Sequence, residues 1–278
     1  QIANTRNKQT QLEMSKNISL SYNEFKKLHK YCKKKKINFL STAFDLSSIK
    51  FLNSLNMKFF KIPSGEITNL PYLSQIGKLK KNVLLSTGMS NMREIGQAIK
   101  VLEKNGTPKK KIIVMQCNTE YPTPLEDVNL RVMHSIQKKF NVNIGYSDHT
   151  LGIDASLWAV AMGAKVIEKH ITLNKSFPGP DHKASINESE LKNLINKIKL
   201  LEIALGSDKK KPTKSEKKNI PIARNSLVAS RNIKKGEKFS LKNITAKRPG
   251  TGISPMSINK ILGKVAKKNF NYDDLIKV

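Results

Sequence analysis

Polar and charged side chains follow five successive apolar runs of the sequence, at the points where the runs end. These end segments are KIPSGE (61–66), STGM (86–89), CNTEY (117–121), SDH (147–149) and EKH (168–170). In a parallel α/β barrel, the residues at the carboxyl ends of the strands line the active site. The sequence therefore predicts one ring of polar groups over an apolar floor.

Two of these ends carry a histidine, His149 and His170. Successive strands are neighbours in such a sheet, so both imidazoles could converge on one divalent ion. Glu168 lies two residues before His170, on the same strand face, where it could support that ligand or bind a substrate. Because no close-spaced histidine motif accompanies the pair, two hydrogen-bonded loop histidines remain an equal alternative at this point.

A second set of strand-end residues has the chemistry of an anion site. Lys61 supplies a cation, and hydroxyl groups come from Ser64, Ser86, Thr119 and Ser147. One cation and several hydroxyls are the hydrogen-bond donors that a phosphate dianion requires. Ordinary capping of a strand end is the better explanation for any one serine, but five such groups in register favour the anion.

The elements that must position these groups alternate between short apolar runs and amphipathic helical patterns. The runs cover residues 37–43, 59–63, 83–86, 112–117, 142–146 and 165–171. Capping-box pairs mark the start of the first helix, at Ser21 and Glu24, and of the last, at Asn187 and Glu190. This alternation predicts an α/β fold with a parallel sheet, open or closed.

The composition changes after Gly206. Residues 207–218 are rich in lysine and contain one proline and no other apolar residue, which is typical of a linker. Short strands are then predicted at 226–230, 238–240 and 244–246. We therefore expect an α/β domain over 1–206, a linker over 207–221 and a small, mostly β domain over 222–278.

The formal net charge of +30 raises the question of a nucleic-acid or membrane partner. Only six of the 51 basic residues are arginine, the residue that base readers and phosphate clamps favour. We therefore expect a solvated lysine surface and no specific nucleic-acid site. No apolar run approaches the roughly 20 residues of a membrane span, so no membrane partner is expected. Two cysteines in the whole chain are typical of a cytoplasmic protein.

Several strings, in this order, closely resemble the sialic acid synthase family. They are FKIPSGE (60–66), LSTGM (85–89), YPTP (121–124), GYSDHT (145–150), EKH (168–170) and PGPDHKAS (178–185). IKKG (233–236) and KRPGTG (247–252) are similar to the antifreeze-like (SAF) domain of the same enzymes. The resemblance implies a TIM-type (β/α)8 barrel followed by a SAF domain of the β-clip type.

The resemblance also implies a reaction. Phosphoenolpyruvate condenses with an N-acetylhexosamine such as N-acetylmannosamine, which releases phosphate and gives an N-acetylneuraminate-type acid. Legionaminic and pseudaminic acid synthases share most of these motifs and stay alternatives, and DHKAS (181–185) is more similar to the neuraminate and legionaminate branches. A basic nucleic-acid-binding protein is a more distant alternative, which predicts salt-dependent binding to duplex DNA.

Site residues follow from the same resemblance. It implies a divalent metal, usually Mn2+ with Mg2+ or Co2+ as alternatives, held by His149 and His170, and a catalytic carboxylate at Glu66. The expected substrate-binding residues are Lys61, Ser64, Ser86, Thr119 (where relatives carry Asn or Ser), Tyr121, Ser147, Asp148, Glu168, Asp181 and Arg248. In this family the SAF domain of one subunit inserts the arginine that matches Arg248 into the barrel of the other, which implies a domain-swapped homodimer.

The number of predicted strands is smaller than the number that a complete barrel requires. Six are predicted over residues 37–171, whereas the barrel has eight, and the first predicted run corresponds to the third strand of the family. The sequence begins with Gln1. We therefore expect that the first two strands are absent and that these 278 residues alone are poorly soluble or inactive. Phosphate release by the purified chain would contradict this.

Overall fold

A computed structural model of the chain describes residues 19–179 and 181–278. The chain divides into two units, Gln1–Gly206 and Ser207–Val278. Each unit is treated by itself below. Gln1, and Pro180 within the PGPDHKAS string, lie outside the described residues.

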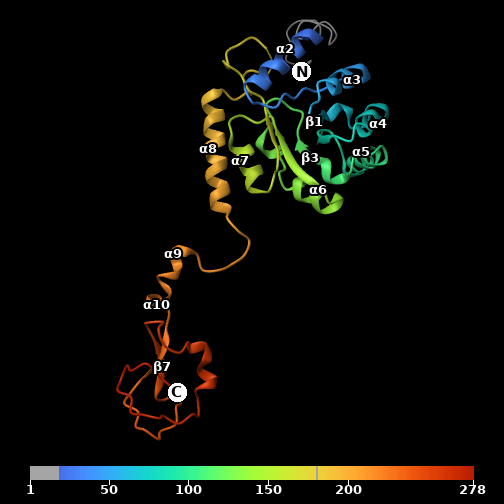
Figure 1. Cartoon of the computed structure of the whole chain (residues 1–278). Coiled ribbons are helices and arrows are strands. Elements are labelled where there is room, and N and C mark those ends of the chain that lie inside the picture. Colours follow the sequence, from blue (N-terminus) through green and yellow to red (C-terminus); the bar gives the residue numbers. More distant parts are fainter. Residues whose placement is uncertain (1–18, 180) are drawn as a thin grey trace. The chain divides into compact units, whose positions relative to one another are not determined.

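The first unit is built on a parallel sheet of five strands that curls into a half-barrel (Figure 1). Its strands follow one another in chain order: β1 (Phe59–Ile62), β2 (Asn82–Ser86), β3 (Ile112–Cys117), β4 (Asn143–Asp148) and β5 (Ile167–Lys169). Every neighbouring pair is parallel. The predicted α/β class is confirmed, while the (β/α)8-type barrel lacking its first two strands stays a prediction.

The predicted strand at residues 37–43 does not form as a strand. Thr42 makes a single parallel bridge to Lys61 of β1, without a continuous ladder. Ile37 and Leu40 of this run are 66% and 43% exposed, so its apolar side chains are not covered on both faces. An apolar run becomes a buried strand only where neighbouring strands and helices cover it, and local composition does not report such neighbours.

Among the described residues of the first unit, seven helices alternate with or flank the strands. They are α2 (Tyr22–Lys34), α3 (Leu46–Ser54), α4 (Leu70–Lys78), α5 (Met92–Lys104), α6 (Val132–Phe140), α7 (Asp154–Ala161) and α8 (Glu188–Leu205). Short 3-10 turns lie at Ser64–Glu66, Lys109–Lys111 and Leu125–Asp127. The capping boxes predicted at Ser21 with Glu24 and at Asn187 with Glu190 are both present.

Strand residues alternate between the two faces of this sheet. On β2, Val83 and Leu85 belong to the apolar core that the helices cover, together with residues such as Ile95 and Ile99 of α5. The intervening Leu84 and Ser86 face the concave side, because successive side chains of a strand point to opposite faces. The core therefore lies between sheet and helices, and the concave face is left for polar groups at the carboxyl ends of the strands.

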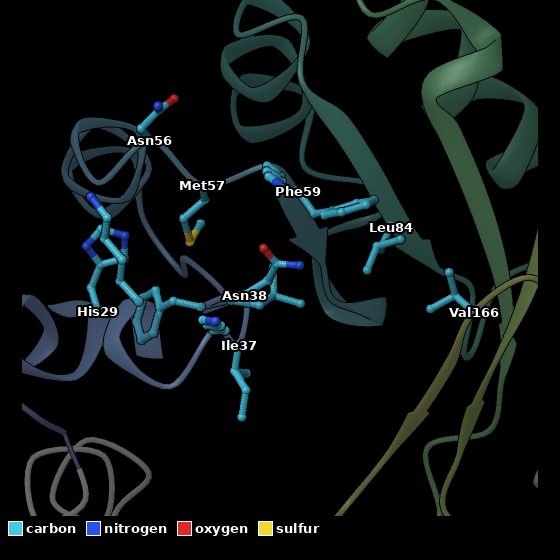
Figure 2. Close-up of a pocket in the computed structure, with 13 residues that line it drawn as sticks. His29, Ile37, Asn38, Asn56, Met57, Phe59, Leu84 and Val166 are labelled. Atoms are coloured by element: carbon cyan, nitrogen blue, oxygen red, sulfur yellow. The ribbon is translucent and has the colours of Figure 1, made fainter. Parts of the chain in front are cut away.

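A hollow of about 500 Å³ opens at the other end of the strands (Figure 2). Phe59 of β1, Leu84 of β2 and Val166, just before β5, line one side, and His29 and Met57 lie on the other. The described residues that line it include lysines but no acidic side chain. It is thus distinct from the polar strand ends.

The second unit contains a two-stranded antiparallel sheet, β6 (Ser226–Ala229) with β7 (Ile244–Lys247), and a 3-10 helix at Pro255–Lys260. Its core includes Leu227, Phe239 and Phe270. The strand predicted at 238–240 is reduced to one bridge between Lys238 and Val265. A short helix, α9 (Lys214–Lys217), lies in the expected linker, and a second, α10 (Ile220–Ala223), begins in it and ends two residues beyond it. Within residues 19–179 and 181–278, none of the helices is long and apolar enough to cross a membrane.

Candidate functional site

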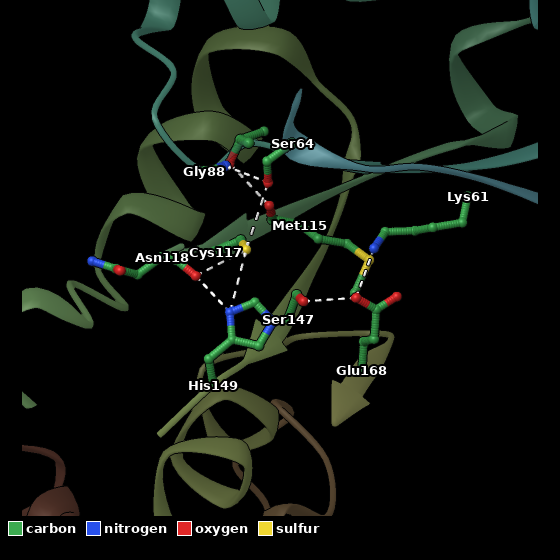
Figure 3. Close-up of polar contacts among 10 residues, drawn as sticks. Lys61, Ser64, Gly88, Met115, Cys117, Asn118, Ser147, His149 and Glu168 are labelled. Atoms are coloured by element: carbon green, nitrogen blue, oxygen red, sulfur yellow. Dashed lines mark hydrogen bonds and ion pairs between the residues drawn. The ribbon is translucent and has the colours of Figure 1, made fainter. Parts of the chain in front are cut away.

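An ion pair across the concave face shows how strongly the sheet curls. Nζ of Lys61 on β1 lies 2.6 Å from Oε1 of Glu168 on β5, although three strands separate β1 from β5 in the sheet. Ser147 of β4 donates its hydroxyl to the same Glu168 oxygen at 2.8 Å (Figure 3). The two edge strands therefore share one polar cluster at the carboxyl ends, as the sequence predicts.

The cation of this cluster is shielded from water and its carboxylate is partly shielded. The side chain of Lys61 is 9% exposed and that of Glu168 is 34% exposed. Burial raises the pKa of Glu168, but the charge of Lys61 and hydrogen bonds from Lys61 and Ser147 outweigh burial, so its pKa is lowered overall. Glu168 is therefore an acceptor, and the ammonium of Lys61 has further donors to offer an anion.

Ser64 and Thr119 meet around Gly88, in the loop after β2. The backbone N–H of Gly88 donates to Oγ of Ser64 at 3.0 Å. A side chain at Gly88 would place its Cβ 2.7 Å from Cγ2 of Thr119 and 2.8 Å from Oγ of Ser64. Ser86, just before this loop, is buried, and its Oγ has no hydrogen-bond partner among the described residues. Buried hydroxyls are nearly always satisfied, so Ser86 is available to a ligand.

This close packing predicts the effect of a methyl group at Gly88. We expect Gly88→Ala to displace Ser64 and Thr119, because the added Cβ is closer than van der Waals contact to both. Overpacking of this kind costs about 1–3 kcal/mol of folding free energy. Binding of phosphoenolpyruvate, used as the anionic probe that the sequence resemblance implies and measured by calorimetry, should weaken at least about tenfold. Gly65→Ala is the control, since a Cβ there meets nothing within 4 Å; equal binding by the two variants would contradict the prediction.

The two histidines lie at the other side of the cluster. Their ring centroids are 5.3 Å apart with planes at 88°, and Tyr121 packs on both rings, 4.0 Å from His149 and 5.4 Å from His170. Nδ1 of His149 lies 2.5 Å from the backbone oxygen of Asn118 (Figure 3). A carbonyl oxygen only accepts, so Nδ1 carries the proton and Nε2 keeps its lone pair.

The donor chemistry of this pair fits a divalent ion. Burial lowers the pKa of His149, which favours the neutral imidazole that binds metals. Two imidazoles bound to one ion at about 2 Å have ring centres about 5 Å apart, which agrees with the observed spacing. Among the described residues, no group of three His, Cys, Asp or Glu side chains could hold a metal. The two histidines would thus need ligands from substrate or water.

Asp181 lies near the histidines. Its Oδ2 is 3.7 Å from Nδ1 of His170, beyond hydrogen-bond distance, and its buried Oδ1 has no partner within the described part of the chain. A carboxylate in this state is open to a hydroxyl or amide donor of a ligand. It therefore belongs with Tyr121 and His170 on this side of the site.

Two predicted residues of the first unit do not join the cluster, and a third belongs to the second unit. Glu66 lies in the 3-10 turn after β1 and accepts a hydrogen bond from Asn69 at 2.6 Å. Asp148 is fully buried on the opposite face of β4, where it contacts Ser156 of α7. Arg248 is an exposed residue of the second unit, directly after β7.

The structure also adds two groups to which the sequence assigned no role. Sγ of Cys117 lies 3.7 Å from Oγ of Ser64 and 4.0 Å from Nδ1 of His149, between the two parts of the site. Burial raises the pKa of this thiol, so it stays protonated. The backbone oxygen of Asn118 sets the tautomer of His149. Cys117 could have been found from the sequence, because alternate side chains of β3 face the concave side and Cys117 is one of them. No sequence signal marks a backbone carbonyl.

Comparisons with known proteins identify the family of the chain. Residues 1–210 match the NeuB family, and residues 224–277 match the SAF domain. The chain is 52% identical to N,N'-diacetyllegionaminic acid synthase of Campylobacter jejuni, over all of this chain and 83% of that protein. It is 37% identical to a pseudaminic acid synthase of Campylobacter jejuni, over 85% of this chain and 68% of that protein.

One solved structure is similar in both sequence and fold. It is N-acetylneuraminic acid (sialic acid) synthetase from Leptospira borgpetersenii in complex with citrate. The TM-score is 0.69 with 33% identity, over 73% of this chain and 70% of that one.

Proposed function

We propose that this chain, which belongs to the NeuB family and ends in a SAF domain, joins phosphoenolpyruvate to an N-acetylated hexose and forms a nonulosonic acid. The observation that supports this most directly is the cluster on the concave face. Lys61, Glu168 and Ser147 meet there, with the His149 and His170 pair beside them. The half of the site that contains Lys61 and the hydroxyl groups, the anion half, suits an anionic substrate. The half that contains the two histidines, the imidazole half, suits a substrate with a carbonyl group.

We propose N,N'-diacetyllegionaminic acid as the product. The 52% identity to a synthase of that acid exceeds the 33% identity to the sialic acid synthetase. The sequence alone favoured N-acetylneuraminate, so the comparisons change the order of these two. Removal of the three carbons of pyruvate from the nine-carbon product leaves a hexose with two acetamido groups as the second substrate.

The anion half would bind phosphoenolpyruvate. Lys61 neutralises its negative charge, and the free hydroxyl of Ser86, with that of Ser64, donates to its oxygens, while Ser147 keeps its hydroxyl on Glu168. The buried setting strengthens these charge-assisted hydrogen bonds. Bound in this way, the enol ether presents carbon 3 to the sugar aldehyde, and the new carbon–carbon bond forms between them.

The imidazole half would face the sugar. A divalent ion bound at Nε2 of His149 and at His170 would polarise the aldehyde oxygen. Asp181 and Tyr121 orient the sugar beside the histidines. As the bond forms, carbon 2 of the enol ether becomes positive. From the resemblance of FKIPSGE (60–66) to the family, we assign Glu66, which lies outside the Lys61 cluster, to stabilise that charge or to accept a proton from the water that adds there. Phosphate then leaves carbon 2, whose new hydroxyl loses its proton and becomes the ketone of the product, while the former aldehyde oxygen takes up a proton and becomes a hydroxyl.

We propose that Arg248 of a second copy of the chain completes the sugar site. Its guanidinium is exposed, and its donors suit the acetamido oxygen of a hexose. Loss of sugar affinity with unchanged phosphoenolpyruvate affinity in Arg248→Ala would support this role. Unchanged sugar affinity would exclude it.

Product analysis tests the proposed reaction. The purified chain, and a chimera in which it replaces the matching part of the Campylobacter jejuni legionaminic acid synthase, are given phosphoenolpyruvate, Mn2+ and one sugar. The sugars are N-acetylmannosamine and the diacetamido hexoses that correspond to legionaminic and pseudaminic acid. We expect phosphate release and a nine-carbon acid with the legionaminate sugar. If another sugar is turned over faster, the product is the acid that corresponds to that sugar, and the assignment to legionaminic acid is wrong. If a folded chimera forms no acid from any of the sugars, the proposed reaction is overturned.

A further inference from the structure

A buried ion pair lies behind the site, on the sheet face that α7 covers. Asp148 of β4 and Lys169 of β5 are direct partners in the strand register, and Nζ of Lys169 lies 3.1 Å from Oδ2 of Asp148. Their side chains are 0% and 5% exposed, respectively. Because side chains alternate along a strand, this pair points away from the concave face while the flanking residues point into it.

Both residues directly precede a histidine of the site. His149 follows Asp148, and His170 follows Lys169. The ladder between β4 and β5 ends at the Asp148 and Lys169 pair. Beyond it the two backbones bond to different loops, His149 to Thr123 and His170 to Ile186. The ion pair is therefore the last tie between these two strands before the histidines.

Lys169 holds the segment on both sides of His149. Besides Asp148, its Nζ donates to the backbone oxygen of Thr150 at 2.5 Å. Oδ1 of Asp148 accepts from the backbone N–H and the hydroxyl of Thr150, each at 2.8 Å. Its Oδ2 accepts from the hydroxyl of Ser156 on α7. Every lone pair direction of this buried carboxylate thus has a donor nearby, which a buried charge requires.

We propose that Asp148 and Lys169 form a clamp that sets the spacing of His149 and His170, so that both imidazoles reach one divalent ion. Neither residue touches the ion or a substrate; both are positioning residues. The inference rests on one part of the proposed function, which is that the two histidines bind the same ion. Groups that orient metal ligands typically change metal affinity about 10- to 100-fold when they are replaced.

The test variant is Asp148→Asn/Lys169→Met, which removes both charges together. Removal of one partner leaves an uncompensated buried charge, whereas neutral replacement of a whole pair is often tolerated. The asparagine amide would keep an oxygen for Thr150, so the loop after β4 retains its local bonds while the tie to β5 is lost. Binding of Co2+ alone is measured by its visible absorption bands, and cooperative thermal unfolding shows that each variant is folded.

We expect Co2+ to bind the double variant at least about tenfold more weakly than it binds the wild-type chain. Two controls should stay within twofold of wild type. Ser156→Ala removes the α7 contact to the same carboxylate but keeps the tie between strands. Lys192→Met removes one lysine charge from an exposed pair with Glu188 on α8.

The outcomes separate the clamp from the proposed function. Wild-type Co2+ affinity in the double variant overturns the clamp alone, as does an equal loss in Ser156→Ala, which would indicate a general structural role. A wild-type chain that binds no Co2+ overturns the shared ion and the clamp together. Should the double variant not unfold cooperatively, Asp148→Asn/Lys169→Gln, which loses both charges but keeps a donor at position 169, is measured by the same criteria.

Discussion

Lys61→Met should weaken phosphoenolpyruvate binding about 100-fold or more. Truncation of one partner of a buried, hydrogen-bonded charge pair costs about 2–5 kcal/mol in binding. Here the loss has two parts, because the anion loses its cation and also meets the Glu168 carboxylate, which Lys61 otherwise neutralises at 2.6 Å. Isothermal titration of the purified chain with phosphoenolpyruvate measures the change.

Two companion variants make this result specific. Lys78→Met removes the same charge from the exposed last turn of α4, so it reports any effect of the net charge of +30. Lys61→Met/Glu168→Gln removes the repulsive carboxylate and should recover part of the affinity and of the stability lost in Lys61→Met. Binding by Lys61→Met at the level of Lys78→Met would exclude Lys61 from the anion site.

Glu66→Gln should lower kcat by about 100- to 10,000-fold, the range expected for loss of a positioned acid or base. The glutamine can still accept the hydrogen bond from Asn69, so the 3-10 turn should keep its shape. Phosphoenolpyruvate affinity should stay within about twofold of wild type, because Glu66 does not contact the Lys61 cluster. Turnover is measured in the chimera and binding in the purified chain.

A neighbouring acid serves as the control for this variant. Glu120 is exposed in the loop after β3, and Glu120→Gln should leave kcat unchanged. Normal turnover by Glu66→Gln would remove Glu66 from the mechanism. A parallel loss of phosphoenolpyruvate binding would instead make Glu66 part of the anion site.

The clamp residue Asp148 illustrates how strand parity extends the sequence argument. The resemblance to the family places it among the substrate-binding residues, within the polar SDH end of a strand. With Ser147 and His149 facing the site, the alternation of side chains directs Asp148 to the covered face, where it lies in the structure. The same parity directs Lys169 away from the site between Glu168 and His170.

The run at 37–43 shows the opposite situation, in which no local rule could succeed. Its composition is that of a buried strand, yet only Thr42 is paired. Whether such a run is covered depends on segments elsewhere in the chain, and composition carries no record of them. Glu66 is similar, since the direction of its side chain depends on how the loop after β1 turns.

The order of the elements, the polar residues at the strand ends and the family can all be predicted from the sequence, because periodicity, capping and motifs are local properties. Which of these residues meet depends on the tertiary packing. Lys61 and Glu168 are 107 residues apart and pair because the sheet curls, and the protonated nitrogen of His149 depends on a backbone oxygen of the neighbouring strand's loop. Curvature and loop position arise from packing over the whole domain, so no short segment encodes them.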